Sequence, residues 1–361
     1  MPQPRAGTWH DQRVPSPARR PAIAAAASAR APRGRIRWAA LLAVLLVGLI
    51  TACGVRLDLP PSPPPVPEGQ DAVRQEAAIA VESLARYARS AAEQAAGETA
   101  ESLDAVARDA EAHLTSLGGV WQPPPRPEAG ETGTGAGDQA DRDGDHAEGE
   151  DAHTAAPAEV VEHLEDTAAA LLSHIDEVDG QMATLLTSVA VNQVLHARQV
   201  RAALDLDPPE PPALPEDPFP AEFGPEAAGL SRLLDASGYV AEVRAARAGG
   251  EERSRLSDHA ARMRAQGAEV AVRAGLAATE DDPREPAYEL DLDDLHGQAV
   301  RLAHARVPAW LHLVEPAAPE DRDLIAAQVL ATAMSVYDVA DPVPVLPGLD
   351  VSAGTEPEPA G

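Results

Sequence analysis

Cysteine, lysine and aromatic residues are nearly or entirely missing from this chain of 361 residues. The single cysteine excludes a disulfide framework and a zinc site built from several thiolates. Lysine is absent, and 58 acidic residues against 29 arginines give a formal net charge of −29. Such an acidic chain does not attract nucleic acid, so we expect no nucleic-acid partner. Because aromatic residues make up only 3%, any core must consist mainly of Ala, Leu and Val.

Strand patterns are missing as well. No stretch alternates between polar and apolar residues over the length of a strand, whereas apolar residues recur at steps of three and four. No nucleophile elbow of the Gly-x-Ser-x-Gly type and no glycine-rich phosphate loop after a strand occurs. We therefore expect an all-α protein with two tandem antiparallel four-helix bundles, joined by proline-rich linkers.

A charge-free run, WAALLAVLLVGLITA, occupies residues 38–52 and follows an arginine-rich segment. It is shorter than the roughly 20 residues that span a bilayer, but it matches the apolar part of a signal peptide. The only cysteine comes next, and Ile50-Thr51-Ala52-Cys53 resembles the bacterial lipobox. The resemblance implies cleavage before Cys53, diacylglycerol on its thiol and anchoring in the lipid bilayer at the extracytoplasmic face of the cell membrane.

The distribution of charge supports export. Removing residues 1–52 takes away eight Arg and one acid, which lowers the formal charge from −29 to −36. The positive charge then stays on the cytoplasmic side, as the positive-inside rule expects. The alternatives are an uncleaved membrane anchor, a cysteine that stands there by chance, and a twin-arginine signal at Arg19-Arg20. Pro21 and the distance to the apolar run disfavour the twin-arginine signal.

Proline-rich segments divide the chain into two helical regions. The predicted order is a signal peptide at 1–52, a lipidated stalk at 53–69, a first bundle at 70–205, a linker at 206–225, a second bundle at 226–340 and a tail at 341–361. Residues 122–156 inside the first bundle are rich in Pro, Gly and acids, so we expect a disordered loop there. Apolar periodicity predicts helices at about 70–95, 103–117, 161–178, 182–204, 226–248, 251–278, 292–315 and 319–340.

Three short motifs stand out in the second region: Leu233-Leu234-Asp235 with Tyr239-Val240, Pro283-Arg284 with Pro286-Ala287-Tyr288-Glu289-Leu290, and Val345-Leu346-Pro347-Gly348-Leu349. Together with the lipobox, the stalk and the tandem Ala-rich regions, they resemble a group of actinobacterial lipoproteins with a ferritin-like domain of unknown function. The resemblance covers roughly 225–349. It implies a ferritin-like four-helix bundle and brings no activity with it.

A ferritin-like bundle that holds two metals needs a Glu-x-x-His pattern on two helices and a Glu on each of two others. This chain lacks that set, because no Glu stands three residues before His259 and because Asp293-x-x-His296 has no counterpart. An atypical site could still use Asp235, Glu242 and His259. This set defines the alternative function, a metal-binding or oxidoreductase protein of ferritin-like fold.

Two further polar features allow more than one interpretation. Asn192, Gln193 and His196 interrupt an otherwise apolar helix, either as a buried hydrogen-bonded network or as partly exposed residues, and the second is favoured. Gln139 to Glu150 imitates a calcium-binding loop, with Gln in place of the first Asp. Here a solvated acidic linker is favoured.

The leading hypothesis is a non-enzymatic lipoprotein of the cell envelope that acts as a helical scaffold or binding module. Its partners would be the bilayer, through acylated Cys53, and a cell-wall or envelope protein. We expect no catalytic residue, cofactor or resident metal. A third hypothesis, a module that shelters a hydrophobic ligand, predicts an enclosed apolar cavity in either bundle.

Overall fold

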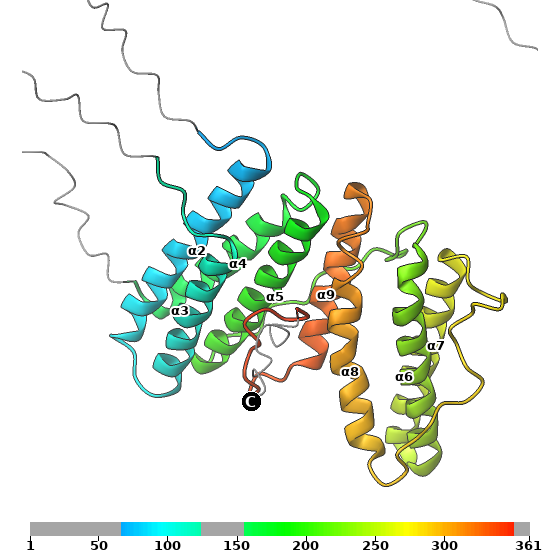
Figure 1. Ribbon diagram of the computed structural model, residues 1–361. Coiled ribbons are helices and arrows are strands. Elements are labelled where there is room, and N and C mark those ends of the chain that lie inside the picture. Colours follow the sequence, from blue (N-terminus) through cyan, green and yellow to red (C-terminus); the bar gives the residue numbers. More distant parts are fainter. Residues whose placement is uncertain (1–65, 124–154, 350–361) are drawn as a thin grey trace, which may run out of the picture. The chain divides into compact units, whose positions relative to one another are not determined.

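The computed structural model describes residues 66–123 and 155–349, and these ranges contain eight α-helices and no strand (Figure 1). All of them belong to one compact unit, Pro64–Gly361. The helices are α2 (Gln70–Ala92), α3 (Glu98–Ser116), α4 (Pro157–Leu172), α5 (Gly180–Ala203), α6 (Ala228–Arg247), α7 (Gly250–Arg273), α8 (Leu295–Leu311) and α9 (Arg322–Val336). Two short 3-10 helices, η1 (Pro225–Ala227) and η2 (Pro319–Asp321), precede α6 and α9. The all-α class is confirmed.

Local sequence signals explain where the helices begin and end. The Asp179 carboxylate accepts a hydrogen bond from the N–H of Met182 at the start of α5, and Asp294 accepts one from Gly297 at the start of α8. Helix α7 ends several residues before the predicted 278, because Gly275 adopts a φ of 69° just after it. Helix ends therefore follow capping residues more closely than the apolar pattern.

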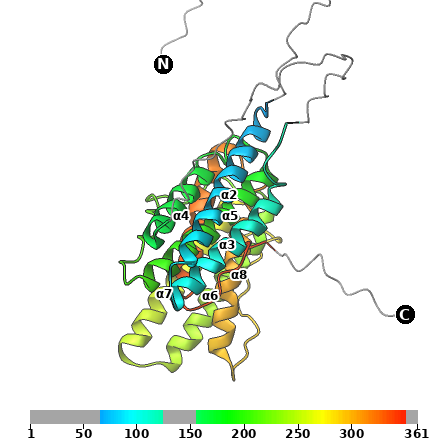
Figure 2. The same ribbon diagram turned by 90° about the vertical axis from the view of Figure 1, so that its left-hand side faces the viewer.

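Helices α2, α3, α4 and α5 pack against one another as a group of four. Helix α2 contacts α3 and α4, and α5 contacts α3 and α4, so each helix has two neighbours within the group (Figure 2). Large side chains that are almost fully buried fill the group: Leu84, Leu103, Leu164, Ile175, Leu186 and Leu195. This continuous apolar interior is the main source of stability in these helices.

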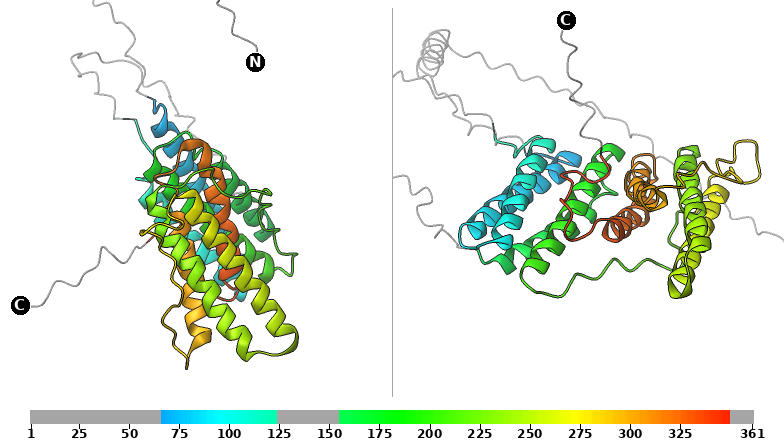
Figure 3. Two further views of the ribbon diagram at one scale, coloured as in Figure 1. Left: turned by 90° about the vertical axis from the view of Figure 1, so that its right-hand side faces the viewer. Right: turned by 90° about the horizontal axis from the view of Figure 1, so that it is seen from below.

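The other four helices are arranged more openly. Helix α6 packs against both α7 and α8, α8 packs against α9, and α9 also packs against α5 of the first group (Figures 1 and 3). One continuous hydrophobic core therefore runs through both regions of the chain. Two separate tandem four-helix bundles, as the sequence predicts, are not confirmed.

The predicted linker at 206–225 takes part in the core at its end. Phe219 is buried and stacks on Trp310 of α8 with ring centroids 5.9 Å apart. Arg273 at the end of α7 donates to the carbonyls of Phe219 and Pro220 at 2.9 and 2.8 Å. The two phenylalanines of the chain, Phe219 and Phe223, both lie in this segment, and their apolar area holds it against α8.

None of the helices in the described ranges is long and apolar enough to cross a membrane. The charge-free run at 38–52 lies outside those ranges.

Candidate functional site

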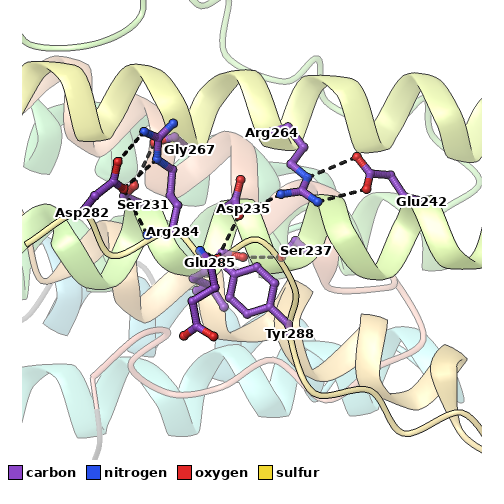
Figure 4. Close-up of polar contacts among 11 residues, drawn as sticks. Ser231, Asp235, Ser237, Glu242, Arg264, Gly267, Asp282, Arg284, Glu285 and Tyr288 are labelled. Atoms are coloured by element: carbon purple, nitrogen blue, oxygen red, sulfur yellow. Dashed lines mark hydrogen bonds and ion pairs between the residues drawn. The ribbon is translucent and has the colours of Figure 1, made fainter. Parts of the chain in front are cut away.

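The two carboxylates of the predicted metal set bind one arginine. Asp235 and Glu242 lie on α6, and Arg264 reaches both of them from α7 (Figure 4). Arg264 Nη1 donates to Asp235 Oδ2 at 2.9 Å, and its Nε and Nη2 donate to the two Glu242 oxygens at 3.2 and 3.0 Å. The guanidinium offsets one of the two negative charges and engages oxygens of both carboxylates that a metal ion would need as ligands.

A second donor, the Tyr288 hydroxyl, completes the surroundings of Asp235. This hydroxyl donates to Asp235 Oδ2 at 2.9 Å and accepts a hydrogen bond from the Glu285 N–H at 3.0 Å. Burial and the neighbouring Asp235 carboxylate raise the pKa of Tyr288 to about 12. The hydroxyl therefore remains protonated at neutral pH and serves as a permanent donor to a carboxylate that is only 7% exposed.

The loop that carries Tyr288 has its own ion pair. Arg284 donates to both oxygens of Asp282 at 2.9 and 2.7 Å. Its hydrogen bonds hold the pKa of Asp282 far below the usual value for an aspartate. Figure 4 draws this pair together with Asp235 and Tyr288. The hydrogen bonds to Asp282 raise the pKa of Arg284, and the Asp235 carboxylate also contributes to this increase.

A close approach of α6 and α7 brings Arg264 within reach of Asp235. A Cβ on Gly267 of α7 would lie only 2.9 Å from the Ser231 carbonyl oxygen and 3.0 Å from the Asp235 nitrogen, both on α6. The Ser231 hydroxyl donates to the Gly267 carbonyl at 2.8 Å across the same contact. Asp235 is therefore buried within a tight helix–helix contact, whereas Glu242, one end of the same ion-pair cluster, is 48% exposed.

His259, the third residue of the predicted metal set, lies in a different environment. It lines a small cavity with Arg244 and Arg306, and no carboxylate lines that cavity. Burial, together with the charges of Arg306, Arg262 and Arg244, lowers the pKa of His259. The three residues proposed as an atypical metal site are thus not brought together. Within 66–123 and 155–349, no group of three His, Cys, Asp or Glu side chains could hold a metal ion.

The polar residues of α5 are buried, which corrects the predicted partial exposure. Asn192, Gln193 and His196 are 1%, 1% and 2% exposed. Asn192 Nδ2 and His196 Nε2 both donate to Asp109 Oδ2 of α3 at 2.8 Å. Burial would raise the pKa of Asp109, but these two hydrogen bonds outweigh it and lower the pKa. The Gln193 amide has no hydrogen-bond partner in the described part of the chain.

The same region of α3 and α5 binds residues 337–349, the C-terminal segment, most of which was predicted to belong to a tail. Five side chains of α3 and α5 donate to backbone carbonyls of this segment, among them Asn192 to Pro344 (2.8 Å), Ser188 to Pro347 (3.0 Å) and His113 to Val345 (2.6 Å). Leu346 is buried in the shared core. The signal in the sequence was a row of polar residues at every fourth position of an apolar helix, Ser188, Asn192 and His196. No local pattern indicated that residues 337–349 bind there.

An apolar cleft of about 180 Å³ lies between α2, α4 and α5 and is partly open. It is lined mainly by Val73, Ala77, Ala80, Ala170, Leu171 and Leu186. The hydrophobic-ligand hypothesis requires an enclosed cavity. This cleft is smaller than the usual 300–1,000 Å³ of small-molecule sites.

The remaining predicted site residues cannot be placed. Ile50, Thr51, Ala52 and Cys53 of the lipobox, and the acidic run from Gln139 to Glu150, lie outside the described residues. Comparisons of the chain with protein-family models, with curated proteins and with solved structures find no match.

Proposed function

We propose that this chain is a lipoprotein of the extracytoplasmic membrane face, with a helical body that acts as a scaffold or binding module and not as an enzyme. The Ile50-Thr51-Ala52-Cys53 motif after a charge-free run, the proline-rich stalk at 53–69 and the acidic remainder of the chain support it. Diacylglycerol on Cys53 would supply two acyl chains, which anchor a protein stably where a single chain does not.

The observation that carries the non-enzymatic part of the proposal is the pairing of Asp235 and Glu242 with Arg264. General acid–base or metal chemistry needs a carboxylate or imidazole that faces a substrate. These carboxylates instead hold two helices together. The buried carboxylate–imidazole pair, Asp109 with His196, is likewise engaged in internal contacts, because Asn192 bonds both to Asp109 and to the C-terminal segment.

For the second region we propose a ferritin-like origin. Four helices, α6 to α9, lie within the residues that resemble ferritin-like lipoproteins. The first motif lies on α6, the second in the loop before α8 and the third in the C-terminal segment. In this proposal the ferritin-like bundle has opened, because α9 packs on α5 as well as on α8.

Lipidation is tested by producing the full chain in a bacterial host and measuring the mass and membrane partition of the mature protein. We expect cleavage before Cys53, a diacylglycerol mass increment and recovery in the membrane fraction. Cys53→Ser should abolish all three, whereas Thr51→Ser, a small-residue exchange within the motif, should preserve them. A wild-type chain with a free Cys53 thiol, or a Cys53→Ser chain processed like wild type, would overturn the anchoring proposal.

The alternative metal-binding function has its own test. The full chain, purified without affinity-tag histidines and equilibrated with iron, manganese and zinc, should retain no stoichiometric metal. Stoichiometric metal that is lost on His259→Ala would contradict the scaffold proposal and establish a metalloprotein. Metal content is also measured for Arg264→Gln, because this substitution frees the Asp235 and Glu242 carboxylates without removing a candidate metal ligand.

A further inference from the structure

A small cavity of about 30 Å³ lies where α6, α7 and α8 meet. Helix α6 packs against both α7 and α8 (Figure 3, right). Its lining is contributed by Ser237, Ala241 and Arg244 of α6, His259 of α7, and Ala299, Ala303 and Arg306 of α8. The alanines supply little bulk, so the long basic side chains determine the chemistry of the space.

Arg306 is a desolvated cation with no anionic partner in the described part of the chain. Its Nη1 contacts the Met263 sulfur at 3.0 Å, while its Nε is buried and makes no hydrogen bond. Burial lowers the pKa of Arg306, and no neighbouring charge compensates for that burial. A buried charge without a partner is costly, and a guanidinium has five donors to satisfy.

The other basic groups around the cavity are also unpaired among the described residues. Arg244 has no carboxylate within 4.0 Å, and His259 has none. This contrasts with Arg264, Arg273 and Arg284 elsewhere in the same region, each of which binds at least one carboxylate. The chain has twice as many acids as arginines, so partners are abundant in general. At this cavity, however, the fold leaves Arg306 and Arg244 without a carboxylate partner among the described residues.

We propose that this cavity binds a small oxyanion of the phosphate class, with Arg306 and Arg244 as its principal donors and His259 as a third. Arginine side chains bind phosphate oxygens by two parallel hydrogen bonds and are preferred for that purpose. A volume of about 30 Å³ admits roughly two water-sized atoms, so two oxygens enter and the rest of the group stays at the mouth. The ligand is therefore free phosphate or the phosphate of a small headgroup.

The net charge of the chain further limits which anions can bind the cavity. At −29 the protein repels anions at long range, which weakens the binding of polyanions most. A single phosphate group gains the short-range contacts in the cavity while it experiences the least repulsion. Because Arg306 is largely buried, binding should also persist at moderate ionic strength better than binding at an exposed arginine.

The first test is calorimetric titration of the full-length chain in detergent with inorganic phosphate, at constant ionic strength set by chloride. Arg306→Gln and Arg244→Gln should each weaken binding by about tenfold or more. Arg108→Gln, which removes an exposed arginine of α3, is the matched control and should leave the affinity unchanged. Circular dichroism verifies that each variant is folded.

A second measurement needs no arginine variant. The pKa of His259, followed by NMR on the chain with labelled histidine and assigned with His259→Gln, should rise when phosphate is added, because the anion favours the protonated ring. Glycerophosphoglycerol, the headgroup of an anionic lipid without its acyl chains, serves as the second probe. Stronger binding of phosphate indicates a free ion as the ligand, and stronger binding of the headgroup indicates a lipid.

Three results would overturn the proposal. One is the absence of binding by both probes. Another is binding that Arg108→Gln weakens as much as Arg306→Gln does, since the interaction would then be with net charge alone. The third is phosphate binding that leaves the His259 titration unchanged. None of these results bears on the lipidation of Cys53, so this proposal and the proposed function fail independently.

Discussion

Helices α5 and α7 each have 24 residues, but 14 residues of α5 are buried and only five of α7. The difference follows from their neighbours. Helix α5 is surrounded by α3, α4, α8 and α9, whereas α7 packs closely against α6. Stability around α5 therefore comes from apolar area shared with several helices, whereas α7 is positioned mainly by its close approach to a single helix, α6.

The contacts that position α7 against α6 are of two kinds. Gly267 lets the backbones of α6 and α7 approach each other, and Arg264 then bridges to Asp235 and Glu242. Neither contact contributes much apolar area. A helix with few buried residues, such as α7, can thus still be held in a defined position, because a small residue and an ion pair fix it against its neighbour.

The largest effect is expected in α5. Leu195 is 2% exposed, and Leu195→Ala should lower the free energy of unfolding by about 2–5 kcal/mol, because it leaves a cavity in a close-packed core. Val272→Ala in α7 is the comparison, since Val272 is 58% exposed and its truncation should change stability by less than about 0.5 kcal/mol. Urea denaturation followed by circular dichroism measures both. Equal losses would show that the two helices are stabilised in the same way.

The next effect should come from the closest contact of α7. Gly267→Ala places a methyl group against backbone atoms of α6 and should cost about 1–3 kcal/mol. Gly229→Ala on α6 is a matched control, because nothing lies within 4 Å of the new methyl, and it should stabilise the helix by about 0.5–1 kcal/mol. The same denaturation experiment distinguishes them. If Gly267→Ala leaves the free energy of unfolding unchanged, α6 and α7 can move apart without loss of stability.

A smaller loss is expected for the ion pair. Arg264→Met leaves the buried Asp235 carboxylate with only the Tyr288 hydroxyl, and should cost about 1–2 kcal/mol, since Arg264 itself is partly exposed. Adding Asp235→Asn to the same chain should recover part of this loss, because the unpaired charge is then gone. If the double variant is no more stable than Arg264→Met, the pairing contributes nothing beyond packing.

The smallest expected effect depends on pH and concerns the other region. Burial lowers the pKa of His113, which donates to the Val345 carbonyl. At pH values well above 6.5 His113 is neutral in both states, and as the pH falls through 6.5 the unfolded chain takes up a proton before the folded chain does. The free energy of unfolding should therefore fall as the pH decreases below 6.5. His113→Gln should reduce this slope, and an unchanged slope would assign it to other histidines such as His259.

Sequence patterns were sufficient for the helices because apolar periodicity is a local property. The proximity of Asp235 and Glu242 on one face of α6 was also implied by their spacing of seven residues. Their partner was not, because Arg264 comes from another helix and its choice depends on the approach at Gly267. His259 was grouped with the carboxylates by composition, whereas its position on α7 turns it toward Arg244 and Arg306.

The buried polar residues of α5 show a similar limit. Partial exposure is the ordinary expectation for Asn, Gln and His, and it was wrong here because Asp109 and the carbonyl of Pro344 satisfy Asn192 from 83 and 152 residues away. A partner that is so distant along the chain produces no periodic pattern in the sequence. The row of polar residues itself was visible, and only its environment had to come from the structure.

The attachment of the C-terminal segment to α3 and α5 has a consequence for the order of folding. Side chains at 113, 188 and 192 are bonded to carbonyls of residues 344–347. The first helical group therefore cannot reach its final hydrogen bonding until residues 344–347 have been synthesised and have docked on it. Closing such a long loop is slow relative to forming local helices. Docking of residues 344–347 on α3 and α5 is thus the last step in the assembly of the first helical group.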